Sequence, residues 1–338
     1  MLLILTDYHF NEVKGGGPAV SLRNLTTKLN IDHKFLFAKT KACDGTDLKE
    51  WSVRILIDDI LKADLIYCNS LFSLKSGILP ILICILFNKK VIVAPRGELL
   101  RGKLKKRFLK KQVYLAFFRN MYRHANVTLH FTSSQEAKES IEILGKVKSF
   151  IASNLVKEIL PDSVARKEGK VIWYSRISKE KNLHLALQSF MASKLPIEFD
   201  IYGPIGDTAY FRKIEAQINR DNRISYKGIM ARNALRDTLS QYDVFLFPTP
   251  AENFGHVIVE AVQSGLFVIT GENIPFDFSG SMNCGISVDI RDLGALTESL
   301  ESYYGNDFQI RNISWNLFLK SLYAGQEKDL QTYRHYLG

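Results

Sequence analysis

Two glutamates, Glu252 and Glu260, stand eight positions apart in the stretch PTPAENFGHVIVEAVQSG, residues 248–265. The stretch follows an apolar run, turns at Gly255, and continues in an apolar pattern that ends at Gly265, as many helices end at a glycine. Glu252 is therefore expected in the turn and Glu260 about two turns into the helix. Carboxylates beside a helix N-terminus suit hydrogen bonding to sugar hydroxyls, while the first amides of the helix suit phosphate or developing negative charge. These amides belong to Asn253, Phe254, Gly255, His256 and Val257.

A structural role is the alternative for both glutamates. Glu252 would then only stabilise the helix dipole, and Glu260 would lie on a solvated helix face. The neighbours of Glu260 are Val, Ile and Ala, which argues against a solvated face because such residues are usually buried. We therefore expect both carboxylates to contact a ligand.

Basic residues gather in the stretch SRISKEKNLHLALQSF, which follows another apolar run. Arg176, Lys179 and Lys181 lie where a strand would end and a helix begin, and cations at this place can clamp a diphosphate. A solvated surface, with Glu180 pairing to the lysines, is the alternative.

A run of three glycines, Gly15, Gly16 and Gly17, precedes Pro18 and a helical pattern. Glycines allow backbone N–H groups to approach a ligand closely, and a phosphate can bind where such a loop enters a helix. The run matches neither GxGxxG nor a Walker motif, so a plain loop is the alternative.

The elements that must position these residues are short Val/Ile/Leu-rich runs that alternate with longer helical patterns in both halves of the chain. This alternation predicts an α/β fold with two doubly wound, Rossmann-like domains, whose ligands bind beyond the carboxyl ends of parallel strands in an interdomain cleft. We expect one domain over residues 1–155 and a second over 156–320. A C-terminal helix over 321–338 is expected to pack back on the first domain.

The segments PTPAENFGHVIVEAVQSG, YSRISKEKNL, DIYGP and YKG together resemble the retaining nucleotide-sugar glycosyltransferases of family 4, which have the GT-B fold. The resemblance extends from GGGPA to about residue 275, and the spacing of Glu252 and Glu260 is its most specific part. It implies transfer of a hexose-type sugar from a UDP- or GDP-linked donor to a glycan acceptor, as in bacterial polysaccharide and lipopolysaccharide biosynthesis. It implies no cofactor and no metal.

The resemblance also implies roles for individual residues. Arg176 and Lys181 match the basic pair that grips the donor diphosphate, and Gly15 to Gly17 match the loop that closes over donor and acceptor. Glu252 matches the glutamate that contacts the donor hexose, and Glu260 the one that holds the ribose hydroxyls. The acceptor hydroxyl would attack on the face from which the diphosphate departs.

One segment departs from the family pattern. Many relatives have a histidine in a PHG segment near the reacting sugar, whereas this chain reads APRGEL with Arg96 in that place. Arg96 could assist departure of the phosphate or bind the acceptor. An ion pair with Glu98 is the structural alternative.

The segment 101–123 is rich in Lys and Arg, has no acidic residue, and interleaves these cations with Leu, Val and Phe. As a helix it would be amphipathic and basic, which is typical of helices that bind anionic membrane surfaces. We expect peripheral binding at the inner face of a membrane and a polyprenyl-diphosphate-linked acceptor. A core-packing helix with a solvated basic face is the alternative.

Composition limits the remaining classes. The net charge of +10 favours anionic partners, yet no helix-turn-helix, RNP or zinc-finger pattern supports binding to nucleic acid. The four cysteines are scattered and the first residues lack a basic signal-peptide region, which favours a reducing, cytoplasmic setting. A nucleotide-sugar epimerase of the same fold is a further alternative, but the two glutamates and the Arg176/Lys181 pair favour a transferase.

Overall fold

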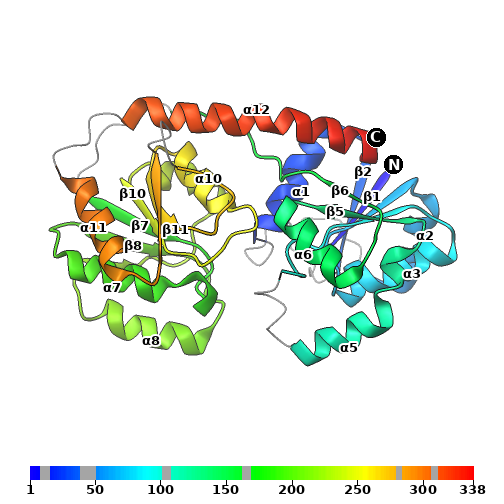
Figure 1. Cartoon of the computed structure of the whole chain (residues 1–338), viewed down its shortest axis with the longest axis horizontal. Helices are drawn as coiled ribbons and strands as arrows, with labels where there is room; N and C mark the ends of the chain where they lie inside the picture. The colour runs from blue at the N-terminus through cyan, green and yellow to red at the C-terminus, as the bar shows by residue number, and fades with distance from the viewer. Residues whose placement is uncertain (8–15, 39–50, 101–107, 162–168, 279–283, 306–310) are drawn as a thin grey trace. The chain divides into compact units, whose positions relative to one another are not determined.

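The computed structural model describes residues 1–7, 16–38, 51–100, 108–161, 169–278, 284–305 and 311–338 (Figure 1). The chain divides into two compact units. Met1–Lys157 and Gly325–Gly338 form the first unit, and Glu158–Ala324 form the second. Within the described residues, each unit contains one six-stranded parallel sheet. The predicted α/β architecture with two doubly wound sheets is confirmed.

The sheet of the first unit has the order β2-β1-β3-β4-β5-β6. Its strands are β1 (Leu2–Thr6), β2 (His33–Phe37), β3 (Leu65–Cys68), β4 (Val91–Val93), β5 (Val127–Phe131) and β6 (Ser149–Ile151). Its helices are α1 (Gly16–Leu29), α2 (Val53–Lys62), α3 (Leu79–Leu86), α5 (Phe108–Phe118) and α6 (Ser134–Leu144), with a π-helical turn at Leu74–Ile78 and a 3-10 turn at Met121–Arg123.

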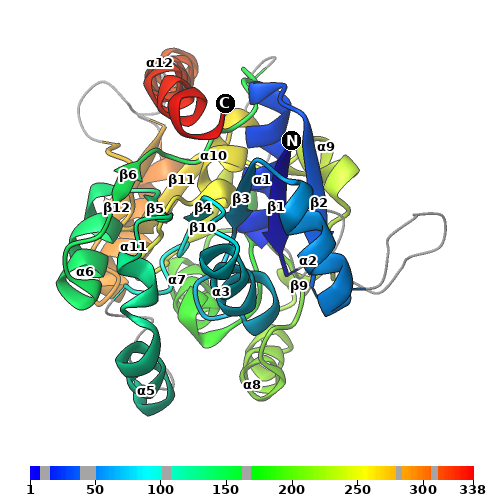
Figure 2. The same cartoon turned by 90° about the vertical axis from the view of Figure 1, so that its right-hand side faces the viewer.

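Alternate side chains of β1 enter two different cores, so β1 is buried on both faces. Leu3 and Leu5 pack in the core that α2, α3, α5 and α6 cover. Leu2 and Ile4 pack in the core that α1 and the end of the last helix cover. Figure 2 shows α2 and α3 on one side of the strands and α1 on the other. This layering explains why the first apolar run shows no polar alternation.

The sheet of the second unit has the order β12-β11-β10-β7-β8-β9. Its strands are β7 (Lys170–Tyr174), β8 (Glu198–Tyr202), β9 (Ile224–Tyr226), β10 (Val244–Phe247), β11 (Phe267–Gly271) and β12 (Gly285–Val288). Its helices are α7 (Leu183–Ser193), α8 (Thr208–Ile218), α9 (Leu235–Leu239), α10 (His256–Gln263) and α11 (Leu293–Tyr304).

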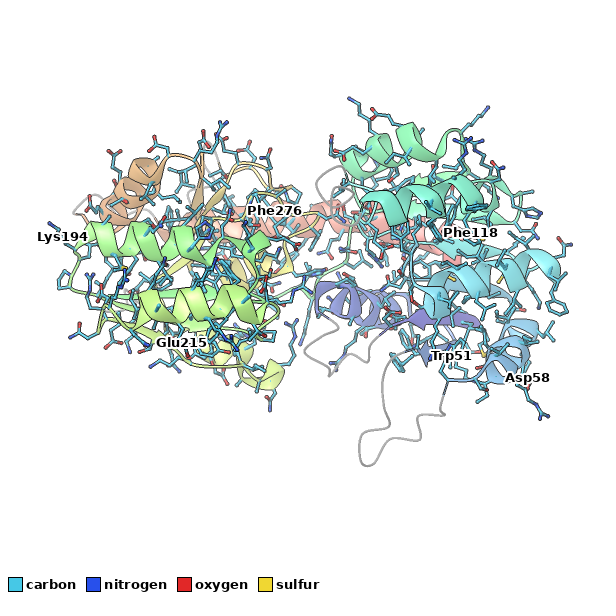
Figure 3. The ribbon with its side chains drawn as sticks, turned by 90° about the horizontal axis from the view of Figure 1, so that it is seen from below. Trp51, Asp58, Phe118, Lys194, Glu215 and Phe276 are labelled. Atoms are coloured by element: carbon cyan, nitrogen blue, oxygen red, sulfur yellow. The ribbon has the colours of Figure 1, made fainter. Side chains whose placement is uncertain are left out.

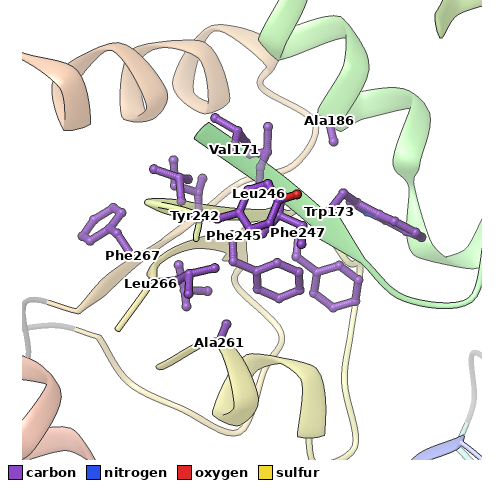
Figure 4. Packing of buried hydrophobic residues seen from close by; sticks show 14 of the residues in the cluster. Val171, Trp173, Ala186, Tyr242, Phe245, Leu246, Phe247, Ala261, Leu266 and Phe267 are labelled. Carbon is purple, nitrogen blue, oxygen red and sulfur yellow. The ribbon is translucent and has the colours of Figure 1, made fainter. Parts of the chain in front are cut away.

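The core of the second unit is aromatic around β7 and β10. Trp173, Phe245 and Phe247 are fully buried between α7 and α10 (Figure 4). The strand order reverses between β7 and β10, so the loops that follow these two strands diverge to opposite faces of the sheet. Ligands of doubly wound sheets bind at such a switch point, beyond the carboxyl ends of the strands. The switch point therefore locates the candidate site.

The last helix, α12 (Arg311–Leu337), contributes to both units. In the second unit, the indole N–H of Trp315 donates to the carbonyl of Leu266 over 2.8 Å. In the first unit, Tyr333 and Leu337 are buried beside Leu2 and Ile4. The burial of these side chains fixes each end of the helix to a different sheet.

Candidate functional site

The turn after β10 brings Glu252 to the switch point of the second unit. The helix that follows begins after Gly255, which has a φ of 77°. A Cβ at Gly255 would lie 3.2 Å from Cδ1 of Ile258 and 3.3 Å from Cε2 of Phe276, the ring labelled in Figure 3. Both the left-handed backbone and the close packing favour glycine here. The glycine of the motif thus shapes the turn that presents Glu252.

Lys181 and Glu252 form an ion pair. The hydroxyl of Thr249 also donates to Oε1 of Glu252 over 3.0 Å, and the ammonium of Lys181 lies 5.5 Å from the centre of the Phe247 ring. The ion pair therefore links the turn after β7 with the turn after β10, which are far apart in sequence. A lysine has three N–H donors, so it can bind an anionic oxygen while it keeps this carboxylate in place.

Glu260 forms the second ion pair of the site. Nη2 of Arg232 lies 2.6 Å from Oε1 of Glu260, and only 13% of the Glu260 side chain is exposed. Oε2 of Glu260 is buried and has no hydrogen-bond partner within the described residues. Burial raises the pKa of Glu260, and the charge of Arg232 opposes this rise. Glu260 does not lie on a solvated face, and a buried carboxylate oxygen of this kind can accept a ligand hydroxyl.

Arg176 follows β7 and is exposed at the same end of the sheet. Its side-chain stem packs over Gly206, where a Cβ would lie 2.8 Å from both Cγ and Cδ of Arg176. Backbone bonds fix the two loops together, since the N–H of Ile177 donates to the carbonyl of Pro204 over 2.9 Å. The loop after β8 therefore supports the stem and leaves the guanidinium at the surface.

The remaining predicted residues of this turn surround the start of α10. Phe254 is buried against Phe276 and His256, with ring centroids 5.9 Å and 4.6 Å apart. Asn253, His256 and Val257 are half-buried. The packing of Phe254 anchors the turn, so that the amides next to it have a defined position.

The glycine run of the first unit differs from the expected loop. Gly16 is already the first residue of α1, and the hydroxyl of Ser21 donates to the carbonyl of Gly17 over 3.0 Å. Gly15 lies outside the described residues. At least two of the three glycines thus belong to the first helical turn, where N–H groups have no partner within the helix.

Arg96 occupies a left-handed backbone conformation, with a φ of 52°, after β4 in the first unit. Its guanidinium donates to Oδ1 of Asn69 over 2.7 Å, to the hydroxyl of Tyr67 over 3.1 Å, and to Oδ1 of Asn154. An arginine outside the favoured backbone region costs free energy, so the surrounding bonds must hold it there. Two segments of the first unit, the end of β3 and the loop after β6, thus fix the position of Arg96.

Glu98 binds the segment after β3. Its carboxylate accepts from the N–H of Leu71 over 2.6 Å, from the N–H of Phe72 over 3.2 Å and from the hydroxyl of Ser70 over 3.0 Å. Glu98 therefore stabilises the entry to the π-helical turn.

Two contacts around the candidate residues Glu260 and Arg96 were not predicted from the sequence. The pairing of Arg232 with Glu260 depends on the turn after β9, and no local pattern distinguishes Arg232 from other surface arginines. His130 is fully buried, and its Nδ1 lies 2.6 Å from the hydroxyl of Tyr67, which contacts Arg96. Only its place inside an apolar strand run signals this burial.

No group of three or more His, Cys, Asp or Glu side chains that could hold a metal ion occurs in the described part of the chain. The charges at the switch point come instead from paired side chains, Lys181 with Glu252 and Arg232 with Glu260. Lysine and arginine can neutralise a phosphate group.

A known protein family matches the part of the chain that forms most of the second unit. Residues 157–304 match the family described as glycosyl transferases group 1. The matched residues correspond almost entirely to the second unit and make up less than half of the chain.

Curated relatives match over a similar length. The GtfA subunit of the UDP-N-acetylglucosamine–peptide N-acetylglucosaminyltransferase of Streptococcus pneumoniae is 32% identical over 124 residues, which cover 36% of this chain and 24% of the relative. The GtfA subunit of Limosilactobacillus reuteri is 29% identical over 114 residues, covering 33% and 22%. The matched part is thus about a quarter of the length of these relatives.

Solved structures resemble the whole chain. Anabaena Alr3699/HepE in complex with UDP and glucose has a TM-score of 0.77 at 16% identity, covering 100% of this chain and 99% of that one. WaaG, a glycosyltransferase involved in lipopolysaccharide biosynthesis, has a TM-score of 0.67 at 14% identity, covering 98% and 99%. The fold is GT-B, as the sequence predicts.

Proposed function

We propose that this protein is a retaining glycosyltransferase that moves a hexose-type sugar from a UDP-linked donor to a glycan acceptor. One observation carries the proposal: the switch point of a glycosyltransferase group 1 domain holds two paired carboxylates, and one of them, Glu260, keeps a buried oxygen without a partner in the described residues. Such an oxygen suits a ligand hydroxyl, and ribose supplies hydroxyls at the nucleotide end of the donor.

The roles follow the positions of the side chains. Arg176 and Lys181 bind the donor diphosphate, with the amides of Asn253 to Val257 near the start of α10. Glu252 contacts the hexose, and Glu260 accepts from the ribose. The acceptor oxygen forms a bond to the anomeric carbon as the bond to the diphosphate breaks, and the departing diphosphate takes the hydroxyl proton. The cations stabilise the charge that develops on the leaving group, so we propose no metal requirement.

The first unit is the proposed acceptor side, with Gly15 to Gly17 closing over the ligands. Arg96 either supports the leaving phosphate or binds the acceptor, and its hydrogen bonds to Asn69, Tyr67 and Asn154 give it one defined position for that task. We propose a polyprenyl-diphosphate-linked glycan as acceptor and a role in cell-surface polysaccharide biosynthesis. Structural similarity to WaaG is consistent with this choice.

Helix α5 supports peripheral binding to an anionic membrane through residues 101–123. Val113 and Phe117 lie one turn apart and are 58% and 77% exposed, whereas Leu115 faces the core. Lysines and arginines precede and follow these apolar side chains in the sequence. Exposed apolar groups among cations suit the boundary between anionic headgroups and acyl chains. Residues 101–107 of the predicted helix lie outside the described part.

None of the helices that the structure describes is both long enough and apolar enough to cross a bilayer. Cys68, Cys84 and Cys284 are buried free thiols, as is usual in a reducing compartment. We therefore propose a cytoplasmic location at the inner face of the membrane.

Thermal denaturation with UDP-sugars, GDP-sugars and the free nucleotides tests the donor site. A ligand at 100 times its dissociation constant adds about 2.7 kcal/mol to stability, so a donor should raise the Tm clearly. We expect UDP compounds to stabilise the wild type and the control Glu215→Gln, whose side chain is exposed on α8. Glu260→Gln should lose most of the shift.

Three results would change the proposal. Stabilisation by GDP compounds alone would mean that the donor carries GDP instead of UDP. The absence of any Tm shift across a saturating panel would contradict the proposed donor site. Conversion of the donor without any acceptor would indicate an epimerase. Retention of the configuration at the anomeric carbon is tested separately, by a proton NMR spectrum of the product.

A further inference from the structure

Arg232 contacts the candidate site from a turn that none of the predicted motifs includes. It begins the 3-10 turn Arg232–Ala234, which follows β9 and leads into α9. Its guanidinium lies 2.6 Å from Oε1 of Glu260 on α10 and also donates to the hydroxyl of Tyr174, the last residue of β7. Three elements of the second unit therefore meet at one arginine.

Because of this contact, the two carboxylate oxygens of Glu260 have different surroundings. Oε1 is occupied by Arg232, whereas Oε2 is buried and has no partner among the described residues. A buried carboxylate needs a partner to stay ionised, because transfer out of water penalises the charged form. Arg232 supplies that partner, and with 47% of its side chain exposed it keeps contact with solvent.

We infer that Arg232 is a positioning residue for donor binding, which holds Glu260 ionised and oriented so that Oε2 accepts a hydroxyl of the donor's ribose. This inference rests on the proposed function. It adds a residue that lies outside the two glutamates and the Arg176/Lys181 pair. Arg232 acts through Glu260, because its guanidinium bonds to Oε1 and leaves Oε2 to accept from the ligand.

The titratable and charged groups that face Glu260 in the described structure are Arg232 and Tyr174. Burial raises the pKa of Tyr174 to about 12, so its hydroxyl stays neutral near pH 7 and adds no charge. Burial also raises the pKa of Glu260, and Arg232 is the group that opposes this rise. Removal of the arginine would raise the pKa of Glu260 further, and donor binding would then improve as the pH increases.

Calorimetric titration of the full-length protein with UDP tests this inference. Titrations at pH 6, 7.5 and 9 would compare the wild type with Arg232→Gln, Arg232→Lys and the control Arg212→Gln. Arg212 is an exposed arginine on α8 of the same unit. We expect Arg232→Gln to weaken UDP binding about tenfold at pH 6, with recovery toward pH 9, because a hydrogen bond to a charged acceptor is lost on protonation. Arg232→Lys should retain most of the affinity, and Arg212→Gln all of it.

A double-mutant cycle separates an indirect effect from a direct one. In the Glu260→Gln background, Arg232→Gln should change UDP affinity less than twofold, because the group on which Arg232 acts has been neutralised. An equal loss in both backgrounds would show that Arg232 contacts the nucleotide directly and would overturn the inference.

Two further outcomes are distinct. If the wild type does not bind UDP at all, the proposed donor site fails. If the wild type binds and Arg232→Gln binds equally well at every pH, the donor site stands and the inference alone fails. Circular dichroism and the Tm of each variant show whether it is folded, and Arg232→Lys serves as the second variant should Arg232→Gln unfold.

Discussion

The hydroxyl of Tyr333 on α12 lies 3.1 Å from Nε2 of His130 on β5, and both side chains are almost completely buried. Nε2 of His130 is also 2.9 Å from the carbonyl of Ala152, so it carries the proton, and Nδ1 accepts from the hydroxyl of Tyr67 over 2.6 Å. Arg96 donates to the oxygen of Tyr67. A polar chain therefore connects the C-terminal helix with the arginine at the carboxyl end of β4.

Tyr333→Phe should destabilise the first unit. The hydroxyl also donates to the carbonyl of Ser153 over 3.0 Å, and its removal leaves this half-buried acceptor with one bond fewer. We expect a loss of about 1–2 kcal/mol, or a Tm lower by roughly 2–6 °C, in differential scanning calorimetry. Tyr336→Phe on the same helix is the control, since its ring stacks on Phe150 and its hydroxyl is nearer to solvent. An equal loss in both variants would contradict the role of the Tyr333 hydroxyl.

His130 should make the protein less stable in acid. Burial lowers the pKa of His130 from 6.5 to about 3. Between these values the unfolded chain binds a proton that the folded chain does not, so stability falls as the pH falls through this window. The loss from this one group amounts to about 3 kcal/mol at pH 4. His130→Gln should flatten the dependence of Tm on pH between 6.5 and 4, whereas His335→Gln at the exposed end of α12 should leave it unchanged. Parallel curves for wild type and His130→Gln would refute this prediction.

The features that follow from local pattern were predictable. Runs such as LLILT and VFLF form strands buried on both faces, because only crossover helices on both sides can bury every residue of such a run. The turn and helix around Glu252 and Glu260 also follow from local signals, an apolar strand, a glycine and a helical period. The predicted places of Glu252 in the turn and Glu260 in the helix agree with the structure. However, α10 begins at His256, so Glu260 lies about one turn into the helix and not about two.

Gly206→Ala should weaken donor binding more than it changes stability. The new methyl group would lie 2.8 Å from Cγ and Cδ of Arg176, so the arginine stem must move away. The stem is flexible, so we expect UDP affinity to fall about three- to tenfold with a Tm change of only a few degrees. Gly305→Ala is the control, because its Cβ would have its nearest neighbour at 3.5 Å. Unchanged affinity in Gly206→Ala would indicate that the position of Arg176 does not matter for the nucleotide.

Gly325→Ala should stabilise the protein. Gly325 lies inside α12, is exposed, and has no atom within 4 Å of an added Cβ. Glycine inside a helix costs about 0.5–1 kcal/mol relative to alanine, so the Tm should rise by roughly 1–4 °C. The same substitution at Gly255, with a φ of 77° and close neighbours, should lower the Tm. A lower Tm for Gly325→Ala would show that this position of the helix must bend or open.

Contacts between distant segments could not be predicted from local pattern. His130 and Tyr333 stand 203 positions apart, and the contact of Arg232 with Glu260 joins the turn after β9 to α10. The glycine run is a different case. Its residues suit a loop because glycine lets backbone N–H groups approach a ligand closely, but Gly16 and Gly17 lie in the first turn of α1, where the N–H groups have no partner within the helix.

Phe117→Glu should abolish membrane binding and leave the fold intact. The ring is 77% exposed on α5, so a carboxylate there costs little stability, whereas it would place a negative charge against anionic headgroups. Sedimentation with vesicles of phosphatidylglycerol and phosphatidylcholine at low salt should pellet the wild type and the control Leu61→Glu, but not Phe117→Glu. Leu61 is an apolar residue on α2 whose side chain is 43% exposed. Added salt should release the wild type, because Lys and Arg near a surface contribute about 1 kcal/mol each and are screened. If Phe117→Glu pellets like the wild type, the basic residues of segment 101–123 bind the vesicles without insertion of apolar side chains. If the wild type stays in solution, the membrane proposal is wrong.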